Sequence, residues 1–161
     1  MIVTPTIFSL KWNKRFMARA REVAAHSKDP IVKVGAVIIG SEKELITDGF
    51  NGYPRGFNEK GNVFSDREYV KQNIVHAEAN ALMNALRTGA RVKNGILYTT
   101  RIPCSGCLGL IKQSGIVAVV VDAPDDAYWE EEDHDQEEIY RRFIDNRMPL
   151  YFLSAELRKV V

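Results

Sequence analysis

The hydrophobic pattern changes from helical spacing to short β-branched runs after the first 30 residues. Apolar residues between 12 and 26 recur every three or four positions, which predicts an amphipathic helix that ends before Asp29-Pro30. The apolar segments 32–39 and 44–50 are separated by Gly40-Ser41-Glu42-Lys43 and predict a β-hairpin. The segment 51–73 is rich in glycine, asparagine and charged residues, so we predict a long loop there.

The second half of the chain alternates between helical and strand patterns. A helix is predicted over 76–88, with Leu82, Met83 and Leu86 facing inward and Gly89 as its C-cap. The remaining predicted elements are strands at 96–100, 116–121 and 150–153 and helices at 104–114 and 136–146. This order predicts a three-layer α/β/α sandwich with a central mixed five-stranded sheet, formed by residues 1–161 as a single domain.

Two short motifs bring together residues that bind zinc. His76-Ala77-Glu78 is followed by Pro103-Cys104-Ser105-Gly106-Cys107. A catalytic zinc has three protein ligands and an open position, whereas a structural zinc has four. His76, Cys104 and Cys107 supply three, and the chain has no other cysteine. Glu78 is then available to transfer protons.

Each motif alone permits other interpretations. Cys-x-x-Cys also occurs in redox proteins and in structural zinc sites, and a His-x-Glu sequence is often only a helix start. A thioredoxin-like fold would leave His76 and Glu78 without a role. The combined pattern is instead typical of zinc-dependent nucleobase deaminases. Both clusters are predicted at helix N-termini, where the helix dipole stabilises thiolates.

Composition and charge narrow the function classes. The chain has 161 residues and a formal net charge of +1, which gives no strong field for a polynucleotide. No apolar run is long enough to span a membrane, and the N-terminus lacks the pattern of a secretory signal. We therefore expect a cytoplasmic protein without membrane or polynucleotide partners. The acidic residues within 125–138 are interpreted as a solvated loop and helix start, with a magnesium site as the secondary alternative.

The motifs resemble those of the cytidine deaminase superfamily, and most closely its deoxycytidylate (dCMP) deaminases. The similarity covers most of residues 14–122 and consists of five segments in the family's order. They are Ser27-Lys28-Asp29-Pro30, Val34-Gly35-Ala36-Val37-Ile38, Gly49-Phe50-Asn51-Gly52 with Pro54 and Gly56, His76-Ala77-Glu78-Ala79-Asn80-Ala81-Leu82, and Pro103-Cys104-x-x-Cys107. Histidine as the first ligand is similar to the dCMP and tRNA-adenosine branches, whereas free-nucleoside deaminases typically have cysteine.

The resemblance implies an activity and a set of binding residues. It implies hydrolysis of dCMP to dUMP and ammonia, supplying dUMP for thymidylate synthesis, with one Zn²⁺ per chain and Glu78 as the catalytic residue. Asn51 would bind the deoxyribose, although it could instead be a left-handed turn residue, and the Ala77 N–H would contact the base. The candidates for the remaining substrate contacts, mainly to the phosphate, are Ser27, Lys28, Lys33, Arg55, Arg101 and Pro103.

The resemblance also implies regulation and assembly. Similar dCMP deaminases are often hexamers that are activated by dCTP with Mg²⁺ and inhibited by dTTP. Gly49-Phe50-Asn51-Gly52 is the corresponding effector segment here, with Phe50 where tyrosine is common. Residues 52–75 contain no cysteine or histidine, so no second zinc is expected.

Three alternatives remain open at the level of sequence. A tRNA adenosine deaminase shares the core motifs but would favour a basic surface. A deaminase of free or modified cytosine nucleosides fits the same motifs. A non-catalytic, zinc-stabilised binding module would be expected to lack an acid at position 78, where this chain has Glu78.

Overall fold

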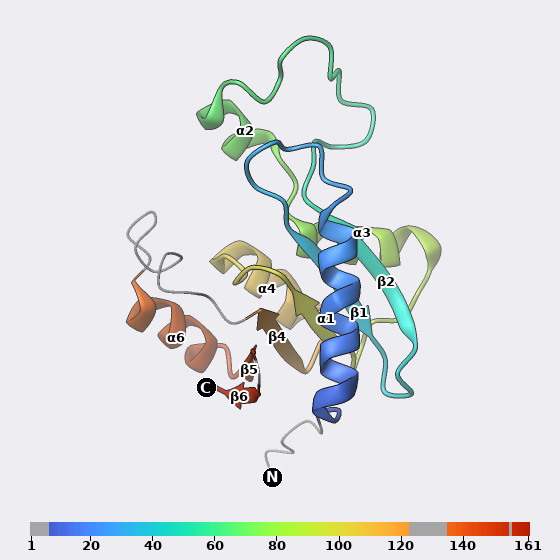
Figure 1. Cartoon of the computed structure of the whole chain (residues 1–161), viewed down its shortest axis with the longest axis vertical. Helices are drawn as coiled ribbons and strands as arrows, with labels where there is room; N and C mark the ends of the chain where they lie inside the picture. The colour runs from blue at the N-terminus through green and yellow to red at the C-terminus, as the bar shows by residue number, and fades with distance from the viewer. Residues whose placement is uncertain (1–6, 123–134, 155) are drawn as a thin grey trace.

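The computed structural model describes residues 7–122, 135–154 and 156–161, and its helices and strands alternate along the chain (Figure 1). The elements are α1 (Leu10–Ala24), β1 (Gly35–Ile39), β2 (Leu45–Phe50), α2 (Arg67–Asn73), α3 (Ala77–Thr88), β3 (Ile96–Thr99), α4 (Ser105–Gln113), β4 (Ala118–Asp122), α6 (Gln136–Asp145), β5 (Leu150–Leu153) and β6 (Leu157–Lys159). Among these described residues, no helix has the length and apolarity needed to cross a membrane.

The six strands form one mixed sheet in the order β2-β1-β3-β4-β5-β6. The predicted hairpin is confirmed by antiparallel pairing of β1 with β2, and β3, β4 and β5 pair in parallel. The prediction of five strands is wrong because β6 pairs antiparallel with β5, with Leu153 opposite Leu157. β6 has only three residues and is mostly exposed, so it carries almost no hydrophobic alternation that could predict it.

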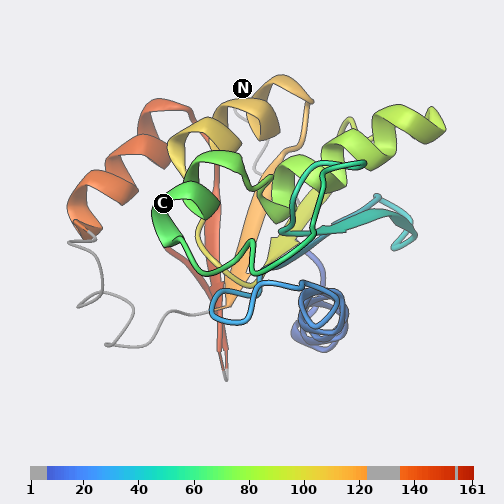
Figure 2. The ribbon, with the colours of Figure 1, turned by 90° about the horizontal axis from the view of Figure 1, so that it is seen from above.

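Helices cover both faces of the sheet, which confirms the three-layer sandwich. Figure 2 shows α1 on one side and α3, α4 and α6 on the other. The alternation along β1 explains this arrangement, because successive side chains of a strand point to opposite faces. Val37 and Ile39 pack in the cluster that contains the α1 residues, whereas Ala36 and Ile38 pack in the cluster that contains α3 and α4.

The inward face of α3 differs from the prediction. Leu82 is buried as expected, but Met83 and Leu86 are 43% and 74% exposed. The other buried residues of α3 are Glu78 and three alanines, including Ala81, and the small alanines let α3 approach β2 closely. A Cβ on Gly49 of β2 would lie 2.3 Å from the backbone nitrogen of Ala81, so contact at this distance requires glycine. Small residues gave a weaker hydrophobic signal than their bulky neighbours.

The prediction of a loop over 51–73 is correct only as far as residue 66. Residues 67–73 form α2, whose N-cap Asp66 accepts a hydrogen bond from the backbone N–H of Tyr69 (3.1 Å). α2 and the preceding loop lie together at one end of the molecule (Figure 1). Arg67 of α2 forms an ion pair with buried Asp29 (3.0 Å), which ties α2 to the segment after α1.

The acidic segment is described only in its last part. Asp135 caps α6 by accepting from the N–H groups of Glu137 and Glu138, both in the first turn. The interpretation as a helix start is therefore confirmed for 135–138. Residues 125–134, and with them the magnesium alternative, lie outside the described residues.

Candidate metal centre and active site

The predicted ligands lie at the N-termini of two neighbouring helices. His76 is the N-cap of α3 and Cys104 the N-cap of α4, which confirms the predicted placement of both clusters at helix starts. The backbone hydrogen bonds between Gly52 and Val75 (2.8 and 3.1 Å) fix the chain just before His76. The Cys104 Sγ accepts the N–H of Cys107 (3.4 Å), so the turn that caps α4 also sets the spacing of the two sulfurs.

The His76 ring nitrogen lies at the distance from each cysteine sulfur that a tetrahedral zinc requires. The His76 Nδ1 lies 3.5 Å from the Cys104 Sγ and 3.6 Å from the Cys107 Sγ. All three donor atoms lie within 4.8 Å of one another. Zinc bonds of normal length place ligand atoms about 3.5 to 3.8 Å apart in a tetrahedron, so the donor set fits the metal. Among the described residues, this is the only such group of histidine, cysteine and acidic side chains.

Charge is distributed unequally over the ligands. Hydrogen bonds from the Cys107 thiol and the His76 ring lower the pKa of Cys104 to about 3. The Cys104 sulfur and burial raise the pKa of Cys107, and the hydrogen bond to Cys104 raises the pKa of His76. One thiolate is therefore already available at neutral pH, and a metal would displace the proton of the other thiol when it binds.

Glu78 is a buried carboxyl group next to the ligands. Its residue is 3% exposed, and its Oε1 accepts a hydrogen bond from the Thr99 hydroxyl on β3 (3.2 Å). Burial raises the pKa of Glu78, although the nearby His76 opposes the shift. A carboxyl group whose pKa is raised toward neutrality can both accept and return a proton, as general acid–base catalysis requires.

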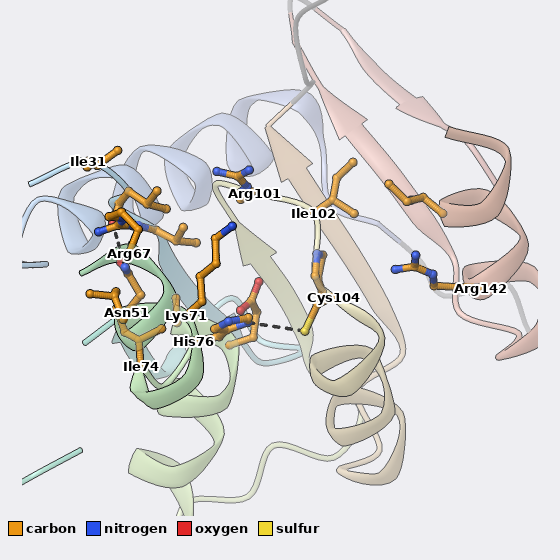
Figure 3. Close-up of a pocket in the computed structure, with 17 residues that line it drawn as sticks. Ile31, Asn51, Arg67, Lys71, Ile74, His76, Arg101, Ile102, Cys104 and Arg142 are labelled. Atoms are coloured by element: carbon orange, nitrogen blue, oxygen red, sulfur yellow. Dashed lines mark hydrogen bonds between the residues drawn. The ribbon is translucent and has the colours of Figure 1, made fainter. Parts of the chain in front are cut away.

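These residues open into a cavity of about 680 Å³, a size typical of small-molecule sites (Figure 3). Asn51, His76, Ala77, Glu78, Pro103 and Cys104 are among its lining residues. The large aliphatic residues of its wall are Ile31, Val32, Val34, Val70, Ile74, Ile102 and Ile139. The basic side chains of the wall are Arg67, Lys71, Arg101 and Arg142. The cavity therefore combines an apolar surface with cations around a buried acid.

Asn51 joins the segment before β1 to the end of β2. Its side chain accepts from the Val34 N–H (2.8 Å) and donates to the Val32 carbonyl (2.8 Å), and it is 5% exposed. Its φ is not positive, so the alternative of a left-handed turn residue is wrong. Each polar atom of the amide can form one more hydrogen bond, which leaves capacity for a ligand in the cavity.

Comparisons with known proteins give the family. Residues 10–123, more than half of the chain, match the sequence model of the cytidine and deoxycytidylate deaminase zinc-binding region. The chain belongs to this family. A probable deoxycytidylate deaminase of Drosophila melanogaster is 39% identical in an alignment of 121 residues that covers 69% of this chain and 59% of the fly protein. Mouse deoxycytidylate deaminase is 34% identical over 134 residues, covering 80% of this chain and 70% of the mouse protein.

A solved structure shares the fold of this chain. The dCMP deaminase of cyanophage S-TIM5, solved in complex with dCMP and dUMP, superposes with a TM-score of 0.71. It is 20% identical and covers 89% of this chain and 98% of the phage protein. The deaminase family match ends at residue 123, so α6 lies beyond it.

Most of the predicted phosphate contacts do not line this cavity. Of the five polar or basic candidates, Arg101 lines it. The Ser27 hydroxyl donates to the Asn51 carbonyl (2.9 Å), and the Lys33 ammonium donates to the Ser27 carbonyl. Lys28 forms an ion pair with Glu59. Arg55 donates to the side chain of Asn84 (2.7 Å). Ser27, Lys28, Lys33 and Arg55 thus do not line the cavity, although Asn51, the partner of Ser27, does.

Four residues in or near the cavity were not predicted from the sequence. Arg67 and Lys71 were hidden in the predicted loop, although Asp66 followed by seven residues without glycine or proline is a helix signal. Arg142 lies on a correctly predicted helix, but a lone cation on a helix carries no signal of its own. Thr99 precedes the cysteine motif by several residues and shows its role only through the fold.

Proposed function

We propose that the protein catalyses the hydrolytic deamination of dCMP to dUMP and ammonia. The observation that supports this most directly is buried Glu78 beside a His/Cys/Cys donor set in a chain of the deaminase family. The names of the relatives, deoxycytidylate deaminases of fly and mouse, support the choice of substrate. The product dUMP would then supply thymidylate synthesis.

His76, Cys104 and Cys107 would hold the zinc in this proposal. Zinc bound there would act as a Lewis acid that lowers the pKa of water toward neutrality. The first-turn N–H groups of α3 and α4 have no intrahelical partners and stabilise negative charge on the cysteine ligands. Ala77 and Asn51 line the same cavity, where the base and the deoxyribose would be positioned by the Ala77 N–H and the Asn51 amide.

Glu78 would transfer the protons. It takes one proton from the attacking water and delivers it to ring N3, while the water oxygen bonds to C4. It then carries the second proton of that water to the exocyclic amine, which leaves as ammonia. The carbonyl oxygen of the product comes from water, so atoms and charge balance. The Thr99 hydroxyl, which lies 3.2 Å from the Glu78 Oε1 and 3.2 Å from the Arg101 carbonyl oxygen, would orient the carboxyl group.

The experiment compares ammonia release from dCMP and from deoxycytidine. Glu78→Gln should retain about one zinc per chain, measured by elemental analysis, while turnover falls by about a hundredfold or more. Exposed Glu42→Gln is the matched control and should behave as the wild type. Full activity of Glu78→Gln would refute the role of Glu78. Turnover of deoxycytidine alone would assign the protein to nucleosides.

We also propose that the effector segment regulates the enzyme within a homo-oligomer, a hexamer by resemblance. A second cavity of about 360 Å³ is lined by Phe50 and Gly52 of this segment, together with Lys28 and Arg55. These cations would suit a nucleotide effector such as dCTP with Mg²⁺, or dTTP. Superimposable hyperbolic curves of rate against dCMP, with and without dCTP, would refute regulation, and light scattering would give the oligomer size.

A further inference from the structure

Positive charge is concentrated around the entrance of the 680 Å³ cavity. Among the described residues that line it, Glu78 is the single acid, and four are lysine or arginine. Glu78 is buried, whereas Lys71 is exposed and Arg101 and Arg142 are half-buried. The acid is therefore deep in the cavity, while the cations are nearer to solvent. We call Lys71, Arg101 and Arg142 the basic rim.

The basic rim comes from three separate parts of the fold. Lys71 lies on α2, Arg101 in the segment between β3 and α4, and Arg142 on α6. Figure 3 shows Arg142 reaching toward the cavity from the side opposite α2, while Lys71 extends toward Arg101. Since the whole chain has a net charge of only +1, this convergence is local. Cations from three sides can surround one anionic group.

Arg67, the fourth cation that lines the cavity, differs from the basic rim because it is paired with a buried carboxylate. Its guanidinium makes three contacts of 3.0 to 3.1 Å with the Asp29 carboxylate, which is buried. This pairing neutralises Arg67 and anchors the start of α2, and thereby helps to place Lys71. Arg142 pairs with Glu138 (2.8 Å), but both side chains are about one-third or more exposed. Exposed pairs of this kind are weak, so Arg142 can turn to a stronger anion.

We propose that the basic rim binds the 5′-phosphate of a mononucleotide, with Lys71 and Arg142 as residues that determine specificity. This inference rests on the proposed function, because the reacting amine must lie at the other end of the ligand, beside Glu78. A dianionic phosphate near Glu78 would be repelled, whereas at the rim it meets three cations. Arginine binds phosphate through two parallel N–H donors and lysine acts as a point charge, so the two contacts differ in geometry.

The size of the basic rim favours a monoester over a polynucleotide. A polynucleotide surface needs cations spread over several successive phosphates, and the balanced charge of this chain does not suggest one. The three rim residues share a single cavity, which accommodates one small molecule. The ligand class is therefore a nucleoside 5′-monophosphate, with the nucleoside inside the cavity and the phosphate at its entrance.

The test measures binding of the product dUMP and of deoxyuridine by calorimetry, which does not depend on turnover. Lys71→Gln and Arg142→Gln are compared with the zinc-loaded wild type. Exposed Lys60→Gln and Arg141→Gln are the matched controls, the latter adjacent to Arg142 on α6. Loss of a charge-assisted hydrogen bond should weaken dUMP binding by roughly tenfold to a hundredfold in each rim variant. Deoxyuridine binding should not change, and Arg142→Lys should recover part of the loss.

Several results would overturn the inference. They are unchanged dUMP binding in both rim variants, equal weakening of dUMP and deoxyuridine, and absence of dUMP binding to the wild type. Tighter binding of an oligodeoxynucleotide of about ten nucleotides than of dUMP would also overturn it, in favour of a polynucleotide ligand. Failure of the proposed function would look different, because the wild type would then bind dUMP through the rim without releasing ammonia from dCMP.

Discussion

Replacing Asp29 with asparagine tests how α2 is held in place. The Asp29 carboxylate is 1% exposed and accepts the N–H groups of Ile31 (2.9 Å) and Val32 (3.1 Å) as well as Arg67. Asparagine keeps one oxygen, which can still accept both backbone N–H groups. Its amide nitrogen cannot accept, so it places a donor against the Arg67 guanidinium. The substitution therefore removes the charge and one arm of the ion pair while preserving shape.

The expected cost follows from the geometry of this pair. A hydrogen bond to a charged group contributes about 1.5 to 3 kcal/mol, and breaking a fully buried ion pair costs about 3 to 5 kcal/mol. Arg67 is 31% exposed, so water solvates it in part after the change. We therefore expect the free energy of unfolding to fall by about 2 kcal/mol. For a chain of this length, that loss lowers Tm by about 4 to 8 °C.

The stabilisation by the Asp29 carboxylate should decrease as the pH falls. Burial disfavours the charge of Asp29, but the N–H groups of Ile31 and Val32 and the Arg67 guanidinium outweigh it and hold the pKa below the usual value. A depressed pKa in the folded state means that the unfolded chain binds the proton more tightly. The stabilisation is thus complete above the usual aspartate pKa of about 3.9 and is lost as the pH falls through the lower, folded value.

Urea denaturation of the zinc-loaded wild type and of Asp29→Asn, at about pH 7 and about pH 3, measures the loss of unfolding free energy and its dependence on pH. Acid also weakens the zinc site, but it does so in both proteins and cancels in their difference. Arg67→Gln and the double variant complete a cycle that isolates the pair. A difference between wild type and Asp29→Asn below about 0.5 kcal/mol at neutral pH would refute the reasoning, as would a difference that stays constant into acid.

Two further predictions concern the support of Glu78 and the packing of α3. Thr99→Val removes the hydroxyl that donates to Glu78 (3.2 Å) and should lower kcat by about tenfold with little change in KM. Thr99→Ser keeps a hydroxyl and should retain most activity. Equal kcat in the two variants would contradict this positioning role. Gly49→Ala would place a Cβ 2.3 Å from the nitrogen of Ala81 and 2.7 Å from the carbonyl oxygen of Ala77. Thermal unfolding should therefore show that the free energy of unfolding falls by about 1 to 3 kcal/mol. An unchanged Tm would contradict the close packing.

The fold was largely predictable because its main elements have strong hydrophobic periodicity. The helix near residues 12–26, the hairpin and the buried strands all carry a clear pattern. α2 has only seven residues and one buried side chain, Val70, so its apolar face was too small to recognise. β6 depends on pairing with β5, and Met83 and Leu86 seemed better core residues than the alanines that actually face the sheet. Short elements and small-residue packing are determined by tertiary contacts.

The chemical centre was more predictable than the substrate contacts for a geometric reason. His76, Glu78, Cys104 and Cys107 lie in two short motifs whose internal spacing is set by helix starts, so sequence separation determines much of their placement. The basic rim has no such local rule, because each member lies on a different element. The contacts of Ser27 likewise depend on the fold: its hydroxyl donates to the Asn51 carbonyl, and its contact with the substrate stays a prediction.

The zinc donor set and the rim cations Lys71 and Arg142 are carried by different helices. The donor set depends on α3 and α4, whereas Lys71 and Arg142 depend on α2 and α6. The helices that carry the two rim cations can therefore vary without moving the zinc ligands, provided that Asp29 continues to hold α2. A change of substrate from nucleotide to nucleoside would then require the loss of rim charge while Glu78 and its ligands persist. If the proposed function holds, proton transfer and phosphate recognition are separable, and substitutions at the rim should change KM before they change kcat.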